Sequence, residues 1–463
     1  MREPLPLESI TQLSGFGRST ASESYAFFPR DASEVQAALS KAKTSGFQIV
    51  LRGAGRSYGD AAIGAECIAL DFSKFNRILN WDSSSGVVEA EPGVTIEDLW
   101  RKCLPEGWWP PVVSGTMFPT LGGALAMNIH GKNAFNVGTL GEHVLEIDVL
   151  FPNGTKHTLT PHDDLFYAVI SSAGLLGVII RVKLQLKKVQ SGLLDVRAKS
   201  CSSWDEQLAT FEERRECSDY MVSWIDAFGS GRGLFHSANY VHENLAYSLK
   251  EEAQDLPSKT LGLIPKAQVW RILKLFNNRH GMRALNLAKH LSSRTIGNKK
   301  THRQSLVAFN FLLDYVPNWQ NAYLPGGFIQ YQSFIPKENA IEIFKEQIAL
   351  QKAERLENYL SVMKRHRPDR FLFSHGVDGY SLAMDFKVTS SNWSRLQNLC
   401  WRMNDLVLSA GGRFYFAKDS TLRPSDVEAF LGQAALSKFR RLKSEFDPAG
   451  LLTSGLAKRT GLG

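Results

Sequence analysis

Residues 52–60 read RGAGRSYGD, and this glycine-rich segment decides the fold. It follows a short apolar run at residues 48–52 that is typical of a buried strand. Glycine and alanine at such a position permit positive φ angles and let backbone N–H groups converge on an anion such as a pyrophosphate. Taken alone, the pattern fits a structural turn as well as a ligand-binding loop, so both interpretations stay open at this point.

Two common nucleotide-binding loops differ from this segment. The Rossmann fingerprint requires a glycine three places after Gly55, where Tyr58 stands, and then a helix, whereas residues 61–71 read as a loop followed by a strand. A P-loop requires Gly-Lys-Ser/Thr, and none follows. The segment therefore argues against a nicotinamide-binding fold and against a P-loop site.

A second glycine-containing stretch runs from residue 114 to residue 133 and includes TLGGALAMNIHGKN at 120–133. Its small residues leave bare backbone against which a large planar or phosphorylated ligand can lie. Close helix packing explains the small residues equally well. It does not explain the polar cluster that follows them, His130, Lys132 and Asn133, so this stretch favours a ligand site.

Outward from these segments, the residue patterns predict an α+β chain. A helix is expected from residue 31, with Ser33 and Gln36 as a capping box, and a hairpin is expected over residues 143–159. Further strands are expected at residues 67–71, 86–90, 177–186, 220–228, 327–335 and 380–387, and further helices at residues 95–103, 336–354 and 391–409, with a last basic helix ending at residue 446. The second half of the chain predicts an antiparallel sheet flanked by helices.

Size and composition limit the class of protein. With 463 residues and 43 % apolar content, the chain can bury two cores, so two domains are expected. No apolar run approaches the roughly 20 residues of a membrane-spanning helix, and the N-terminal residues lack the apolar centre of a secretory signal. Five dispersed cysteines argue against a disulfide framework and against a cysteine-rich metal site. We expect a cytoplasmic protein without a metal.

The net charge of +8 is concentrated in one segment. No Asp or Glu occurs from Leu256 to Phe311. Eleven lysines and arginines do occur there, at positions 259, 266, 271, 274, 279, 283, 289, 294, 299, 300 and 303. They alternate with the apolar residues Leu263, Ile264, Trp270, Ile272, Leu273, Leu275 and Phe276, a mixture that is typical of an amphipathic surface helix. The segment predicts a local anionic partner.

Three partners or environments can explain this segment. Anionic lipid headgroups or a polyprenyl phosphate are attracted to such a surface, by roughly 1 kcal/mol per basic residue near a bilayer. Nucleic acid is a rival, but no recognised binding motif accompanies the stretch. A solvated loop is the simplest alternative. We expect peripheral contact with the inner membrane and no nucleic acid.

The sequence resembles the FAD-binding module of the vanillyl-alcohol-oxidase, or p-cresol-methylhydroxylase (PCMH), class of flavoproteins. Within that class it resembles the decaprenylphosphoryl-β-D-ribose 2′-oxidase family. The phrases that carry the resemblance span nearly the whole chain: RGAGRSYGD at 52–60, GGALAMNIHGKN at 122–133, GLLGVIIR at 174–181, GFIQYQSFIP at 327–336 and GGRFYFAKDS at 411–420.

The resemblance implies a two-domain α+β fold of the FAD-binding PCMH type. Residues 1–190 would form the FAD-binding domain, which residues 409–463 would complete. Residues 191–408 would form a substrate-binding cap domain built on an antiparallel sheet flanked by helices. The basic segment at 256–311 would be a mobile flap over the substrate entrance.

The resemblance also implies FAD as the cofactor. Many members of the class attach FAD through a histidine in the first glycine segment, but Arg56 stands at that position, so non-covalent FAD is expected. The residues expected to contact FAD are Arg52, Gly53, Ala54, Gly55, Arg56, Ser57, Tyr58, Gly59, Asp60, Gly115, Thr116, Thr120, Leu121, Gly122, Gly123, Met127, Asn128, Ile129, His130, Ile179 and Tyr415.

Oxidation of an alcohol by a flavin requires a hydride acceptor, a base for the hydroxyl proton and a cation that stabilises the reduced ring. Through the resemblance, Lys418 is expected to be that cation, and Lys364 is expected to be a further active-site lysine. Tyr58 and His130 match positions near the flavin that place the substrate hydroxyl or relay its proton. A buried structural histidine is the alternative interpretation of His130.

Gln330 and Gln332 complete the expected catalytic residues. They alternate with Tyr331 on one predicted strand, so both amides face the same side, which in the family is the substrate side. An exposed polar face of a sheet is the alternative. The family's mycobacterial members carry a cysteine beside the flavin where this chain has Ala383, so covalent inhibitors directed at that cysteine are expected not to react. The three residues after Lys364 also differ, which leaves the sugar specificity open.

The activity implied by the resemblance is oxidation of the 2′-hydroxyl of a polyprenyl-phosphoryl-β-D-ribose to a ketone. This is the first half of an epimerisation to the arabinose donor for cell-envelope synthesis, and a separate short-chain reductase would be the functional partner. The alternatives are an oxidase or dehydrogenase of a soluble alditol or aldonolactone, and a scaffold that keeps a flavin fold without turnover. The basic segment favours a lipid-linked substrate, and the presence of Lys418, Tyr58 and both glutamines argues against the scaffold.

Overall fold

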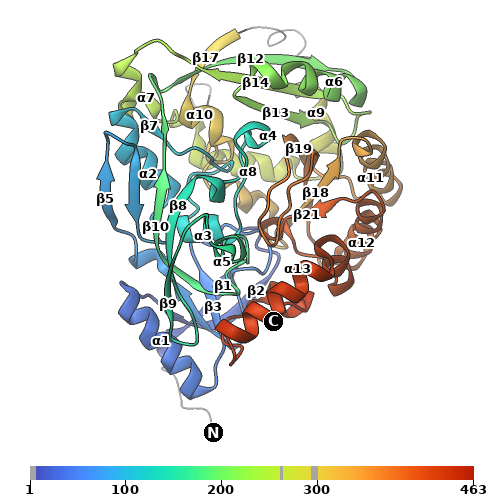
Figure 1. Cartoon of the computed structure of the whole chain (residues 1–463). Coiled ribbons are helices and arrows are strands. Elements are labelled where there is room, and N and C mark those ends of the chain that lie inside the picture. Colours follow the sequence, from blue (N-terminus) through green and yellow to red (C-terminus); the bar gives the residue numbers. More distant parts are fainter. Residues whose placement is uncertain (1–6, 261–263, 293–300) are drawn as a thin grey trace.

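The computed structural model describes residues 7–260, 264–292 and 301–463 (Figure 1). Three larger sheets dominate the fold, and two two-stranded sheets accompany them, β7 (Trp108–Trp109) with β11 (Lys187–Lys188) and β15 (Lys259–Thr260) with β16 (Ile264–Pro265). Residues 261–263 and 293–300 of the predicted basic segment lie outside the described ranges, and they include Leu263, Arg294, Lys299 and Lys300. Helices and sheets are mixed as the sequence predicts for an α+β fold.

Two of the larger sheets are built from the first 190 residues. The four-stranded sheet has the order β1 (Ile10–Ser14), β2 (Ala21–Phe27), β4 (Ile68–Asp71) and β3 (Ile49–Arg52), and β4 runs parallel to both of its neighbours. The five-stranded antiparallel sheet has the order β5 (Ile78–Asp82), β6 (Val87–Ala90), β10 (Val178–Gln185), β8 (Val144–Leu150) and β9 (Lys156–Leu159). The predicted hairpin over residues 143–159 is the β8–β9 pair.

The predicted first helix is confirmed as α1 (Ala32–Ser45), but its N-cap differs from the prediction. Asp31, rather than Ser33, caps the helix, because its carboxylate accepts hydrogen bonds from the backbone N–H groups of Ser33 and Glu34. Gly46 ends the helix with φ of 71°, and the chain then enters β3. The glycine-rich segment thus begins where a buried parallel strand ends.

The third sheet has eight antiparallel strands and forms most of the predicted cap. Its order is β17 (Thr301–Ser305), β12 (Leu193–Cys201), β14 (Gly233–Tyr240), β13 (Tyr220–Ile225), β19 (Leu360–His366), β20 (Gly379–Lys387), β18 (Phe328–Pro336) and β21 (Arg413–Phe414). The sequence predicts β13, β18 and β20 but not the strands between and beside them. The predicted boundary at residue 409 falls just before β21, which pairs with β18 at the edge of this sheet.

Helices cover one face of the eight-stranded sheet. On that face α11 (Ala340–Glu354) and α12 (Trp393–Ser409) pack against β18, and α6 (Trp204–Arg214) packs against β12 and β14, as Figure 1 shows for the outer side of the molecule. The opposite face carries polar side chains and lines a cavity. The cap sheet is therefore a wall between a helical layer and the site.

The remaining helices are short, or belong to the basic segment and the C-terminal tail. They are α2 (Ile96–Cys103), α3 (Leu121–Ala126), α4 (Ala134–Val137), α5 (Asp164–Val169), α7 (Glu251–Gln254), α8 (Lys266–Phe276), α9 (Arg279–Ser292), α10 (Leu306–Asn310), α13 (Pro424–Phe446) and α14 (Gly455–Thr460). In its described part, the acid-free segment forms the helices α8, α9 and α10 and the strands β15, β16 and β17, where one amphipathic helix is predicted. Within the described ranges no helix combines the length and the apolar character that crossing a membrane requires.

The C-terminal tail returns to the first sheet. The Ile49 N–H donates to the Leu451 carbonyl at 2.7 Å, and the Thr453 N–H donates to the Ile49 carbonyl at 2.8 Å, so residues 451–453 lie beside β3. The Lys443 ammonium donates to the Leu175 carbonyl at 2.8 Å. The tail is thereby joined to the part of the chain that precedes residue 190, at the lower end of the molecule in Figure 1.

Candidate active site

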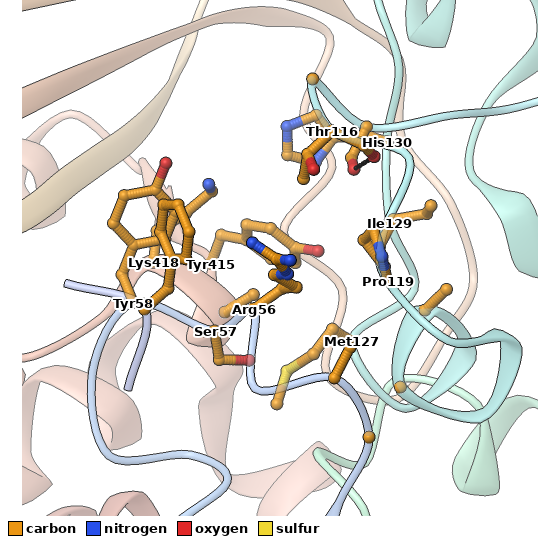
Figure 2. Close-up of a pocket in the computed structure, with 18 of the residues that line it drawn as sticks. Arg56, Ser57, Tyr58, Thr116, Pro119, Met127, Ile129, His130, Tyr415 and Lys418 are labelled. Carbon is orange, nitrogen blue, oxygen red and sulfur yellow. Dashed lines mark hydrogen bonds between the residues drawn. The ribbon is translucent and has the colours of Figure 1, made fainter. Parts of the chain in front are cut away.

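One cavity of about 550 Å³ lies between the two glycine segments and the inner face of the eight-stranded sheet. All six predicted catalytic residues line it, namely Tyr58, His130, Gln330, Gln332, Lys364 and Lys418. In Figure 2, Tyr58 and Lys418 stand together on one side, and Thr116, Pro119 and Ile129 stand on the opposite side. Residues from distant parts of the chain thus converge on one site.

Most of the residues predicted to contact FAD also line this cavity. They are Arg52, Gly53, Ala54, Gly55, Arg56, Ser57, Tyr58, Gly115, Thr116, Thr120, Gly122, Gly123, Met127, Ile129, His130, Ile179 and Tyr415. Four others are absent from the lining: Gly59, Asp60, Leu121 and Asn128. Leu121 is fully buried in the core, and the Asn128 side chain accepts a hydrogen bond from the Gly141 N–H at 2.9 Å.

Gly59 and Asp60 join the glycine segment to the C-terminal tail. A Cβ atom on Gly59 would lie 2.2 Å from the carbonyl oxygen of Asp419, so only glycine fits there. Asp60 binds the Arg459 guanidinium through both carboxylate oxygens, at 2.8 and 3.0 Å, and Arg459 also donates to Asp419 at 2.8 Å. These two residues hold the loop in place from behind the cavity.

The contacts between the glycine segment and the C-terminal tail, which we call the joint, also position Lys418. The Tyr58 N–H donates to the Ala417 carbonyl at 2.8 Å, and the Lys418 ammonium lies 3.7 Å from the centre of the Tyr58 ring. Burial lowers the pKa of Lys418, while the nearby Asp385 acts against this shift. A cation whose charge is poorly solvated interacts strongly with any negative charge that develops beside it.

Asp385 is a buried acid that the sequence analysis did not select. It lies on β20 opposite Gln330 of β18, and the Gln330 amide donates to its carboxylate at 2.5 Å. Burial raises the pKa of Asp385, and the Gln330 hydrogen bond and Lys418 act in the other direction. Since the Gln330 amide nitrogen faces Asp385, the carbonyl oxygen of Gln330 is left for a ligand.

Gln332 is held in a chain of buried side chains. Its amide nitrogen donates to the Ser381 hydroxyl at 3.1 Å and contacts the His130 Nε2 at 3.2 Å. Because an amide nitrogen can only donate, His130 Nε2 accepts, and His130 Nδ1 donates to the His375 Nε2 at 3.0 Å. The Ser381 hydroxyl lies 2.8 Å from the His366 Nε2.

This chain of hydrogen bonds gives Gln332 and His130 distinct roles. Both amide hydrogens of Gln332 are used, so its carbonyl oxygen is available to accept a hydrogen bond from a substrate hydroxyl. Both ring nitrogens of His130 are also engaged, and burial holds its pKa well below the usual range. His130 therefore positions Gln332 and remains neutral.

The cavity lining is cationic. It includes six basic side chains, Arg52, Arg56, Lys132, Lys289, Lys364 and Lys418, and within the described ranges it includes no Asp or Glu. Burial lowers the pKa of Lys364 to about 8. Such a lining suits a ligand that brings negative charge of its own.

The residues present fit FAD. The first segment, with Gly53, Ala54 and Gly55 beside Arg56, offers backbone N–H groups and positive charge to a pyrophosphate. Residues 122–126 offer a small-residue surface to a flat ring system, and the cavity volume lies within the range of roughly 300–1,000 Å³ that is common for ligand sites. Bound there, FAD would supply the acceptor for a hydride.

Comparisons with known proteins agree with this geometry. The family model described as "FAD binding domain" matches residues 24–160. The decaprenylphosphoryl-beta-D-ribose oxidase of Mycolicibacterium smegmatis is 29% identical over 461 residues, which cover 97% of this chain and 97% of that protein. The chain is an FAD-dependent oxidoreductase. The predicted resemblance to decaprenylphosphoryl-ribose oxidases is confirmed along nearly the whole chain.

Other relatives of this oxidoreductase are similar over shorter parts. A putative D-arabinono-1,4-lactone oxidase of Neurospora crassa is 26% identical, over 33% of this chain and 28% of its own length. L-gulonolactone oxidase 2 of Arabidopsis thaliana is 24% identical, over 37% of this chain and 33% of its own length. The match to the FAD-binding domain model supports FAD as the cofactor of the enzyme.

Four residues of the enzyme's site are missed by the sequence analysis: Asp385, Ser381, His366 and His375. Asp385 and Ser381 share β20 with Ala383, which lines the cavity opposite Gln332. His366 lies two residues after Lys364 on β19, so strand alternation could have placed both on one face. No pattern in the sequence indicates His375, because only the tertiary structure brings its loop beside His130.

The buried histidines His130, His366 and His375 are expected to make the enzyme less stable in mild acid. Burial lowers all three pKa values, that of His375 to about 3, whereas in the unfolded chain they return to about 6.5. Below about pH 6.5 the unfolded chain therefore binds protons that the folded chain does not bind. Because an unfolded histidine is already half protonated at pH 6.5, the free energy of unfolding should fall by about 1 kcal/mol per histidine, or about 3 kcal/mol for the three, between about pH 6.5 and 5.5.

Urea unfolding at these two pH values measures this loss, and His375→Phe is the matched variant. Phenylalanine fills a similar volume and does not titrate, so the pH-dependent loss should shrink by about a third, whatever the absolute stability of the variant. An unchanged pH dependence in His375→Phe would contradict the assignment of His375 as a buried neutral histidine.

Proposed function

We propose that this oxidoreductase oxidises a sugar hydroxyl to a ketone, and that its substrate is a polyprenyl-phosphoryl-β-D-ribose oxidised at the 2′-hydroxyl. The observation that carries the proposal is the convergence of all six predicted catalytic residues on one cavity that both glycine segments also line. Similarity to the Mycolicibacterium smegmatis oxidase over 97% of both chains supports the choice of substrate. A short-chain reductase that reduces the ketone is the proposed functional partner.

In this proposal Gln332, Tyr58 and Lys418 have distinct tasks. The carbonyl oxygen of Gln332 accepts a hydrogen bond from the reacting hydroxyl and orients the C–H bond. Tyr58 stays protonated, because burial raises its pKa well above the usual range, so it can donate a hydrogen bond to a substrate oxygen. Lys418 supplies positive charge where negative charge develops, and a fraction of its amine is neutral because burial lowers its pKa, so it can also take up the hydroxyl proton.

A soluble alditol or aldonolactone is the second candidate substrate. The two lactone oxidases similar to parts of this chain favour it. A neutral sugar would leave the basic side chains that FAD does not need without a negatively charged partner in the cavity. The lipid-linked sugar phosphate is therefore the better match to the charge of the site.

Anaerobic mixing with farnesyl-phosphoryl-ribose is expected to bleach the visible absorbance of the oxidised flavin, whereas free alditols should leave it unchanged. Lys418→Ala should slow bleaching about 10²- to 10³-fold, because removal of one preorganised charge-stabilising group costs about that much. Lys43→Ala, at an exposed site on α1, is the control and should react as the wild type does. Bleaching by alditols but not by the lipid-linked ribose would reverse the choice of substrate.

We also propose that FAD is bound without a covalent link. Arg56 occupies the position at which many members of the class carry a linking histidine, and no cysteine is among the described cavity-lining residues. Acid precipitation is expected to leave all of the yellow colour in the supernatant. Flavin retained on the denatured chain would show a covalent link and identify another attachment residue.

The basic segment carries a surface that fits an anionic membrane. In the described part of the chain eleven large apolar side chains are exposed, and five of them belong to α8 and α9: Ile272, Leu275, Phe276, Leu287 and Leu291. Leu275 is 76 % exposed, and Arg271, Lys274 and Arg283 are exposed on the same helices. We call this the α8–α9 surface. Arg279 anchors it to the cap through an ion pair with the buried Glu357 at 2.6 Å.

We propose that the α8–α9 surface docks on an anionic bilayer. Co-sedimentation at low salt should be stronger with phosphatidylglycerol vesicles than with phosphatidylcholine vesicles. Leu275→Glu should weaken it about 10-fold or more, because a leucine side chain is lost from the apolar contact. Leu79→Glu is the matched control, since Leu79 is 47 % exposed on β5, outside this surface. Equal binding of both variants, or no binding to anionic vesicles, would sink the proposal.

A further inference from the structure

Two of the six cavity lysines and arginines stand apart both from the segment at residues 52–60 and from the two glutamines. Arg52 and Arg56 belong to that segment, and Lys418 and Lys364 accompany the two glutamines. Lys132 and Lys289 line the cavity together with Trp224 and His236, which belong to β13 and β14. The cationic lining thus has a second region on the cap side.

Three positively charged or polar groups converge in that region. The Lys289 ammonium, from α9, lies 4.4 Å from the centre of the Trp224 ring. Lys132 enters from the second glycine stretch and donates to the backbone carbonyls of Phe309 and Asn310. His236 lies within electrostatic reach of both lysines, which, together with burial, lower its pKa to about 4, so it is neutral at pH 7.

Among the residues that the structure describes, neither lysine has a carboxylate partner. Lys132 is 6 % exposed, and its described contacts are two carbonyl oxygens and the Phe309 ring, which orient an ammonium group without neutralising it. The side chain of Lys289 remains accessible at the cavity, yet the protein around it lowers its pKa to about 8. Burial also lowers the pKa of Lys132 well below its usual range. An anion bound in the cavity would therefore stabilise the charged form of both lysines.

This region lies where a group attached to the reacting sugar would be placed if the sugar binds at Gln332. Gln332, Ala383, Val362 and Trp224 lie opposite one another on four successive strands of the cap sheet. Neighbouring strands are about 4.8 Å apart, so the row spans roughly 14 Å from Gln332 to Trp224. Because lysine side chains extend into the cavity, a ligand has to bridge less than this span to contact both Gln332 and a lysine. A pentose ring at Gln332 with a phosphate beyond it fits that distance.

We propose that Lys132, Lys289 and His236 form the subsite that binds the phosphate of the lipid-linked sugar. The inference rests on the proposed function and assigns to it the residues that distinguish a phosphorylated substrate from a free sugar. FAD has its own candidate groups for its pyrophosphate at residues 53–56. Lys132 and Lys289 are therefore left for a second anion.

The same helix connects this subsite with the α8–α9 surface. Lys289 lies two residues from Leu287 and from Leu291, a spacing of about 200° around a helix, so the lysine and the two exposed leucines point to opposite sides of α9. A phosphate held by Lys289 thus lies just inside the helix whose outer side is apolar. This arrangement gives the polyprenyl chain a route from the phosphate toward a bilayer.

Titration of the holoenzyme with farnesyl phosphate, followed by calorimetry, tests the subsite without any turnover. Lys289→Met should weaken binding by about 10- to 100-fold, the value of a hydrogen bond to a charged group, and Lys289→Arg should restore most of it. Lys43→Met on α1 is the control and should bind as the wild type does. Lys132→Met should weaken binding in the same way, provided that its visible flavin spectrum shows a folded holoenzyme.

Equal affinity of the wild type and Lys289→Met for farnesyl phosphate overturns the subsite. Inorganic phosphate is the second probe, and competition by it as strong as that of farnesyl phosphate would indicate a site for a free anion and would also overturn the assignment. Kinetics separate the subsite from the proposed function. If farnesyl-phosphoryl-ribose is oxidised, Lys289→Met should raise KM at least about 10-fold with kcat changed less than about 3-fold.

The two proposals can fail separately. Binding of farnesyl phosphate that depends on Lys289, without flavin bleaching by farnesyl-phosphoryl-ribose, would retain the phosphate subsite and reject the ribose substrate. Bleaching with an unchanged KM in Lys289→Met would retain the substrate and reject the subsite.

Discussion

The site depends on the joint between the glycine segment and the C-terminal tail. The Tyr58 N–H donates to the Ala417 carbonyl, and the absence of a side chain at Gly59 lets the Asp419 backbone approach the loop. Arg459 then binds both Asp60 and Asp419. This joint fixes Lys418 against the Tyr58 ring, although the two residues are 360 positions apart in the chain. Without it, the charge that the chemistry needs would have no fixed place.

In the cavity beside that joint, the fold removes water from several basic groups. Burial lowers the pKa values of Lys418, Lys364 and Lys289, and it keeps His130 neutral. Poorly solvated cations act more strongly on a nearby negative charge than cations in water do. The same desolvation lowers the stability of the protein without ligands. Ligands that carry phosphate, as FAD and the proposed substrate both do, therefore stabilise it most.

Part of the site could be predicted from the sequence because its residues lie in continuous sequence motifs. Strand alternation alone places Gln330 and Gln332 on one face, and both line the cavity. The role of Asp60 could not be seen, because its partner Arg459 is 399 residues away. The helix cap was also misplaced, since Asp31 and Ser33 both suit an N-cap and only the backbone geometry decides between them.

The sequence by itself determined the kind of protein. Glycine spacing excluded two nucleotide-binding loops, local periodicity gave most of the helices and the central strands, and the phrases shared with a flavoprotein class indicated FAD. Those signals are local, and backbone propensity and short spacing carry them.

Only the tertiary structure decided which charges meet. The neutral state of His130, the free carbonyl of Gln332 and the convergence of Lys132 with Lys289 depend on contacts between residues far apart in the chain. A side chain's solvation and hydrogen-bond partners are properties of the packed chain, because they depend on which distant atoms displace water around it.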